Sequence, residues 1–147
     1  MRLLDVFLQY GRALEWMTSA IIFVFACTLA LPGDTLAASR SFSSFRDVGL
    51  TEENLILAFT LIAVMRFAGL WINGSWRRSP VLRMTGAALG AGIFWALAAL
   101  FAAPYLSGVQ GALTSGVGTY AVLGAADAWA AYRAAADVPR YRRDRVF

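Results

Sequence analysis

Four long apolar stretches alternate with shorter polar segments along the chain, and this pattern predicts four transmembrane helices. The expected spans cover residues 14–32, 54–73, 82–103 and 109–132. Each is close to the roughly 20 residues that a helix needs to cross a hydrocarbon layer of about 30 Å. We therefore expect an all-α polytopic membrane protein: a single domain, residues 1–147, in which the four helices form an antiparallel bundle.

The segment before the first span, residues 1–13, places polar side chains at helical spacing among leucines, Phe7 and Tyr10. Such a pattern is typical of an amphipathic helix lying in the headgroup region. Glu15 extends the polar stripe by one turn and can pair with Arg12 at i, i+3 spacing.

The longest loop, residues 33–53, is rich in serine and acidic residues. We expect a solvated connector, with Phe42 and Phe45 on the membrane surface. Thr51 and the two glutamates after it are suited to the start of the second span, because acidic side chains favour a helix N-terminus.

One alternative concerns the first span, because the basic start, the apolar run and Thr35-Leu36-Ala37 resemble a signal peptide with its cleavage site. The segment before the apolar run is long for that purpose and contains Asp5 and Glu15. We therefore expect the first span to be retained.

The arginines predict the orientation of the spans. With an even number of crossings the two termini share a side, and only Arg40 and Arg46 fall on the opposite side, while Arg66 lies inside a span. The remaining arginines share the side of the termini: Arg2, Arg12, Arg77, Arg78, Arg83, Arg133, Arg140, Arg142, Arg143 and Arg145. The positive-inside rule then places both termini in the cytoplasm, which predicts a protein of the bacterial inner membrane.

Composition supports the membrane interpretation and excludes several kinds of chemistry. Hydrophobic residues make up 59% of the chain and charged residues 15%, against about 25% charged in soluble domains. Histidine is absent and Cys27 is the single cysteine, so the usual zinc, iron–sulfur and Ser-His-Asp sites lack their residues. We expect no enzyme activity, no cofactor and no metal.

Arg66 and Asp127 are the charged residues that lie deep inside predicted spans, whereas Glu15 and Arg83 lie at the ends of theirs. A charge at that depth costs at least about 2.5 kcal/mol. Counted from Asn73 and Arg133, both lie about 10 Å inside the membrane at 1.5 Å per residue. The matched depth predicts a structural ion pair between the second and fourth spans, to which Tyr120 can add a hydroxyl. The alternative is that Arg66 extends toward the headgroups.

Small residues at four-residue spacing predict where helices pack closely. Gly86 and Gly90 form a GxxxG pattern in the third span, and Ala88 with Gly92 repeats the spacing on a neighbouring face. Ala112 with Gly116 has the same spacing in the fourth span. Such residues let helices approach in lipid. They fit contacts within one bundle and contacts between copies, so a homo-oligomer or another membrane protein is an expected partner.

The chain ends in a basic segment, residues 133–147, which we expect to be a cytoplasmic tail held by anionic lipid headgroups. Nucleic-acid binding is not expected, because no folded reading surface accompanies the charge. The predicted headgroup contacts are Arg77, Arg78, Arg140, Arg142, Arg143 and Arg145.

The turn between the second and third spans resembles that of small, uncharacterised four-span membrane proteins encoded in phages and prophages of proteobacteria. The matching residues are Arg66, Leu70, Asn73-Gly74, Trp76, Pro80, Arg83 and Gly86-Ala87, followed by Asp127 and Tyr132-Arg133-Ala134. The first span and the long loop are not matched. The resemblance implies a phage context and no particular mechanism.

That context makes a holin-like protein the first functional hypothesis: a self-associating protein that permeabilises the inner membrane. Four spans, and the lack of a long polar face, count against it. The second hypothesis is a non-enzymatic structural or accessory subunit of a membrane complex. The third and weaker one is a small four-span transporter that uses Glu15 as its coupling carboxylate.

Overall fold

The structure is a computed structural model that describes residues 12–75 and 80–143, and every regular element in those two ranges is helical. The prediction of an all-α fold is therefore confirmed. The elements are α2 (Ala13–Leu29), α3 (Thr35–Ala38), η2 (Arg40–Phe42), α4 (Ser43–Asp47), α5 (Glu52–Ser75), α6 (Pro80–Leu106) and α7 (Ser115–Arg143). Most of the amphipathic segment predicted for residues 1–13 lies outside the described residues.

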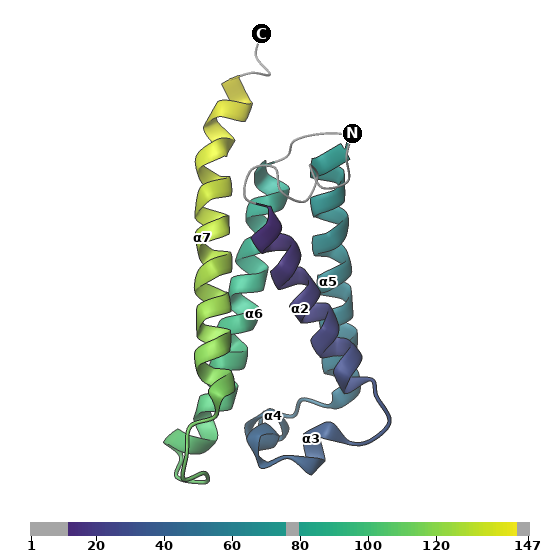
Figure 1. Cartoon of the computed structure of the whole chain (residues 1–147), viewed down its shortest axis with the longest axis vertical. Helices are drawn as coiled ribbons and strands as arrows, with labels where there is room; N and C mark the ends of the chain where they lie inside the picture. Colours follow the sequence, from purple (N-terminus) through teal and green to yellow (C-terminus); the bar gives the residue numbers. More distant parts are fainter. Residues whose placement is uncertain (1–11, 76–79, 144–147) are drawn as a thin grey trace.

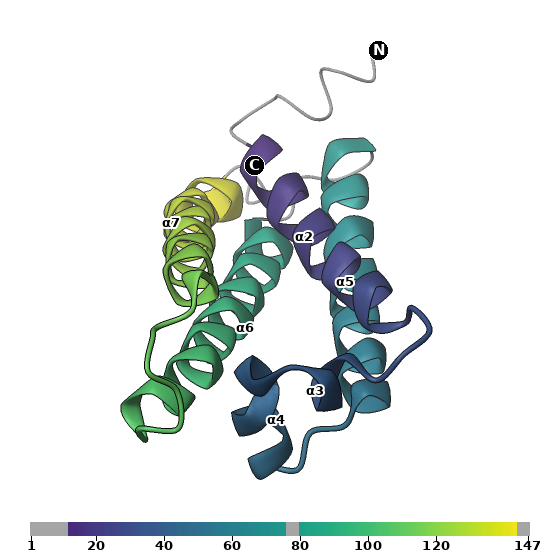
Figure 2. The same ribbon diagram turned by 60° about the horizontal axis from the view of Figure 1, so that its bottom comes forward.

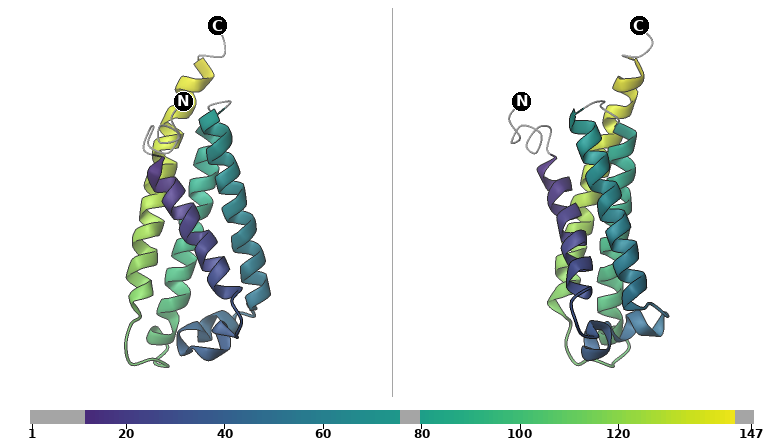
Figure 3. Two further views of the ribbon diagram at one scale, coloured as in Figure 1. Left: turned by 45° about the vertical axis from the view of Figure 1, so that its right-hand side comes forward. Right: turned by 90° about the vertical axis from the view of Figure 1, so that its right-hand side faces the viewer.

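Four long helices run along the length of the molecule, and α3 and α4 lie together at one end (Figure 1). α2 packs mainly against α5, and α6 packs mainly against α7. α2 is inclined to the other three helices, as two further views show (Figure 3). The molecule thus consists of two helix pairs joined across a shared interior.

Two of the described helices are long and apolar enough to cross a membrane, namely Glu52–Ile72 within α5 and Pro80–Leu106. α2 is apolar but has 17 residues. The fourth predicted span begins too early, because α7 starts at Ser115 and residues 109–114 form the turn before it. The third helix continues through Pro104 to Leu106, past the end that we predicted.

The loop of residues 33–53 is not a simple connector, because side chains fold it into short helices. Asp34 accepts a hydrogen bond from the backbone N–H of Ala37 at 2.8 Å and so caps α3. Glu52 accepts one from the N–H of Thr35 at 2.7 Å, which ties α3 to the start of α5. Figure 2 shows α3 and α4 lying across the space between the ends of α5 and α6.

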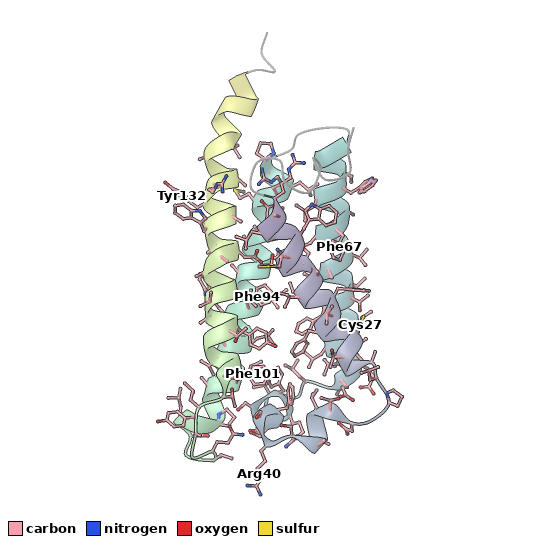
Figure 4. All side chains as sticks on the ribbon, in the orientation of Figure 1. Cys27, Arg40, Phe67, Phe94, Phe101 and Tyr132 are labelled. Carbon is pink, nitrogen blue, oxygen red and sulfur yellow. The ribbon has the colours of Figure 1, made fainter. Side chains whose placement is uncertain are left out.

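Phe42 and Phe45, which we expected on the membrane surface, instead pack into the bundle. Phe45 is fully buried, and its ring lies 5.1 Å from that of Phe101 in an edge-to-face contact. Tyr120 of α7 stacks on the other side of this group, 5.5 Å from Phe101. Phe94 and Phe101 point inward from α6 (Figure 4). The core at this end of the bundle is therefore largely aromatic.

The predicted basic tail is in part a helix. α7 continues to Arg143, ten residues past the boundary that we set at Arg133, and its end extends beyond the other helices (Figure 1). The alanines of residues 134–136 are the best helix formers and allow the helix to continue.

Candidate functional site

The structure brings Arg66 and Asp127 together in the interior of the bundle. Arg66 donates from Nη1 to Asp127 Oδ2 at 2.6 Å and from Nη2 to Oδ1 at 3.0 Å. The two side chains are 3% and 0% exposed. A bidentate, desolvated pair of this kind is among the stronger hydrogen-bonded contacts in proteins.

Two hydroxyl groups of α2 complete this pair. Thr18 Oγ1 accepts from Arg66 Nη2 at 2.7 Å and donates to Asp127 Oδ1 at 2.7 Å. Ser19 Oγ accepts from Arg66 Nε at 2.9 Å and donates to the carbonyl oxygen of Glu15 at 2.6 Å. We call these four side chains the central network: Arg66, Asp127, Thr18 and Ser19. It joins α2, α5 and α7.

Sequence reasoning missed Thr18 and Ser19. Their signal was two adjacent polar residues within an apolar span. The hydroxyl that we assigned to the pair, that of Tyr120, lies elsewhere, because the Tyr120 ring stacks on Phe101 in the aromatic core. Thr18, one turn after Glu15 on the same face of α2, supplies the hydroxyl instead.

Gly90 of α6 leaves the space that the central network occupies. A Cβ atom at this position would overlap with Arg66 Nη1 and Asp127 Oδ2. Gly86, one turn earlier, lies against the stem of Arg66, whose Cγ would be 3.8 Å from an added Cβ. The GxxxG pattern therefore serves the ion pair, and all four long helices meet at this point.

A second ion pair lies next to the central network. Arg83 of α6 donates from Nε to Glu15 Oε2 at 3.3 Å and from Nη2 to Oε1. The Glu15 and Arg83 side chains are 4% and 12% exposed. The sequence indicated Arg12 as a possible partner of Glu15, and the structure adds Arg83 of α6 as one. Glu15, Thr18 and Ser19 share one face of α2, because residues three and four apart are neighbours on a helix.

The outcome for the other predicted packing residues is mixed. Gly116 lies in the first turn of α7, where an added Cβ would be 3.7 Å from the Phe101 ring. Gly92 is exposed, and an added Cβ would meet nothing within 4 Å. Ala112 lies in the turn before α7 and is exposed. A packing role inside the bundle is therefore wrong for Gly92 and Ala112.

The predicted headgroup arginines are not placed by the structure. Arg77, Arg78 and Arg145 lie outside the described residues, as do the side chains of Arg140, Arg142 and Arg143 at the end of α7.

A cavity of about 260 Å³ lies between α5 and α6, beside the second ion pair. Small residues and larger apolar side chains from both helices line it, together with the charged residues Glu15, Arg66 and Arg83. This cavity exists because α5 and α6, although consecutive, each pack mainly against a different helix.

No family model, curated protein or solved structure matches this chain. What the site can do thus follows from its own chemistry. A permanent cation is held by a carboxylate and two hydroxyls, which satisfies most of the donors of a guanidinium. Such an arrangement fixes which helices meet, because every other partner would leave a buried charge unpaired.

Proposed function

We propose that the chain is an integral protein of a bacterial inner membrane in which α2, α5, α6 and α7 all cross the lipid. The main support for four membrane crossings is the position of Arg66. It lies within the most apolar part of α5, yet bonds directly to α2 and α7 through Thr18, Ser19 and Asp127. These three partners have short side chains, so their helices lie at the depth of Arg66.

The exposed side chains support the same proposal. On α5, Leu57, Leu61 and Val64 are each more than half exposed, and on α7 Val122 is 69% exposed. Charges inside and large apolar side chains outside are the reverse of a soluble protein, in which large exposed apolar patches are rare. In a membrane these outer apolar side chains contact lipid and not water.

Exposed aromatic rings mark one boundary of the proposed membrane layer. Trp71 lies near the end of α5, and Trp129 with Tyr132 lies on the outside of α7, each more than half exposed. Tyr132 points away from the bundle in Figure 4. Tryptophan and tyrosine favour the membrane interface, and this is the end of the bundle that carries Arg83.

The arginine-rich end is the cytoplasmic one in this proposal, and the end with α3 and α4 faces the periplasm. Arg40 projects from that second end (Figure 4). Cysteine labelling tests the orientation in a Cys27→Ala background. Val48→Cys, at an exposed position after α4, is expected to react with an impermeant maleimide in intact cells, and Ala136→Cys only after lysis. The opposite pattern would refute the orientation.

For the role itself we propose a non-enzymatic structural or accessory subunit of a membrane complex. The supporting feature is that the charged side chains of the central network bind one another within a single chain. A bundle of this kind is complete as a monomer, with an apolar surface that suits packing against another membrane protein or lipid. Expression alone is then harmless to the cell.

A second candidate, a holin-like protein, is favoured by one face of α6. Ala88, Gly92 and Ala96 are exposed at four-residue spacing along that helix, and small residues of this spacing promote helix contacts in lipid. A second copy can therefore approach there.

Inducible expression in bacteria with a membrane-potential dye separates the two roles. Steady fluorescence and normal growth support the accessory role, whereas abrupt depolarisation supports the holin-like one. In the latter case Gly92→Leu is expected to abolish depolarisation, with the exposed substitution Ala58→Leu on α5 as the matched control.

The transporter hypothesis has the least support. It requires a carboxylate that exchanges partners with its substrate. Glu15 is 3% exposed and is engaged by Arg83.

A further inference from the structure

The cavity between α5 and α6 has apolar walls that are open to the outside of the bundle. Its rim consists of side chains that are between about two-fifths and three-fifths exposed: Met65 and Ile72 from α5, and Leu82 and Leu89 from α6. In the membrane proposed above, this opening faces acyl chains. Any occupant therefore enters from the lipid.

The cavity is small, and its volume limits what it can hold. Small residues from both helices line it, Ala68 and Gly69 from α5 and Gly86 and Ala87 from α6. Longer side chains lie over the two glycines, because an added Cβ would be 3.4 Å from Leu82 at Gly69 and 3.8 Å from Arg66 at Gly86. The cavity volume of about 260 Å³ is below the range of roughly 300–1,000 Å³ that is usual for whole drug-sized ligands. An extended hydrocarbon segment suits this shape.

Three of the residues that line the cavity are charged: Glu15, Arg66 and Arg83. Arg83 is the more accessible member of its ion pair, with a side chain that is 12% exposed. Its two contacts with Glu15 use two of the five N–H donors of a guanidinium. Donors therefore remain for an anionic oxygen at the cytoplasmic end of the cavity.

The surrounding sequence is complementary to an anion. No aspartate or glutamate occurs between Glu53 and Asp127, so α5 after its first turn and the whole of α6 contribute only arginine as charged residues. Basic pockets between transmembrane helices on the cytoplasmic side are known as sites for anionic lipid headgroups.

We propose that this cavity binds one anionic glycerophospholipid, with an acyl chain between α5 and α6 and its phosphate on Arg83. The site rests on the proposed membrane location of the bundle. It deepens that proposal, because it names one lipid that is held specifically among those that surround the protein.

Native mass spectrometry of the full chain in detergent tests the site. The probes are phosphatidylglycerol and phosphatidylcholine with the same acyl chains. One arginine near the membrane surface corresponds to about a fivefold preference for the anionic lipid. We expect one bound phosphatidylglycerol per chain with about that preference.

Two variants separate the contribution of the acyl chain to binding from that of the headgroup. Ala68→Phe fills the cavity and is expected to weaken both lipids by about tenfold, whereas Ala58→Phe, exposed on the same helix and outside the cavity, leaves binding unchanged. The double substitution Glu15→Gln with Arg83→Gln replaces the ion pair by two amides, which can hydrogen-bond to each other. It is expected to remove the preference for phosphatidylglycerol and to keep the binding of phosphatidylcholine.

Either of two results would overturn the proposal: wild-type binding in Ala68→Phe, or a headgroup preference that persists in the double variant. The membrane location has its own readout, because a chain released from membranes by alkaline carbonate would refute the location itself. If the protein stays in the membrane under alkaline carbonate but binds no lipid selectively, only the lipid site is refuted.

Discussion

Removing either partner of the Arg66–Asp127 pair is expected to destabilise the bundle strongly. Asp127→Ala leaves a guanidinium that cannot lose its charge, held by Thr18 and Ser19 alone. Arg66→Ala leaves a carboxylate that can neutralise itself by taking up a proton, so it is the milder change. Loss of one partner of a buried pair costs about 3–5 kcal/mol, and we expect Asp127→Ala at the upper end of that range.

The double variant carries neither charge. Its cost is expected to be about 2–3 kcal/mol less than the sum of the single costs, which is the coupling energy of two side chains in direct contact. At about 2–4 °C per kcal/mol for a chain of this size, each single variant is expected to melt about 10 °C lower. With single costs of about 3 and about 5 kcal/mol, the double variant is expected to cost about 5–6 kcal/mol and so to melt close to Asp127→Ala, well above the temperature that simple addition would give.

Thermal unfolding in one detergent, followed by circular dichroism, measures this cycle. The control pair is Thr28→Ala with Thr119→Ala, two exposed hydroxyls that bond to the backbone of their own helices. Its effects should add. Losses that also add within about 0.5 kcal/mol for Arg66 and Asp127 would refute the contact between them.

Three further predictions use the same measurement, two around the pair and one in the aromatic core. Gly90→Ala forces a Cβ into the central network and is expected to cost at least about 3 kcal/mol, whereas Gly92→Ala should change stability by less than about 0.5 kcal/mol; equal effects would contradict the assigned roles. Thr18→Ala removes a hydroxyl from both ions and is expected to cost about 1–2 kcal/mol, more than the exposed Thr28→Ala. Phe45→Ala opens the aromatic core and should cost about 3–5 kcal/mol; a neutral result would show that α4 does not seal the bundle.

The Arg66–Asp127 contact could be predicted because each residue is an isolated charge in an apolar stretch. A charge inside lipid needs a partner, and their distances from the ends of the spans match. The helical fold was predictable from the long apolar stretches, because a backbone group in lipid must be hydrogen-bonded within its own helix.

Other features depend on contacts that leave only a weak trace in the sequence. Hydroxyls of Thr18 and Ser19 can bond to their own helix at little cost, so their presence in a span predicts no partner. Phe42 and Phe45 occur in a polar segment, and whether such rings face lipid or a core depends on how α3 and α4 fold back. The fourth helix was predicted to begin too early because residues 109–114 are as apolar as the helix that they precede.

The side chains of the central network are synthesised at different times. Thr18 and Ser19 are synthesised before Arg66, whereas Asp127 follows 61 residues later, which takes about 3–12 s at 5–20 residues per second. During that interval the carboxylate partner of the Arg66 guanidinium is not yet part of the chain. The central network is therefore completed only once α7 has been synthesised, and chains that end before Asp127 are expected to be degraded more rapidly than the full chain.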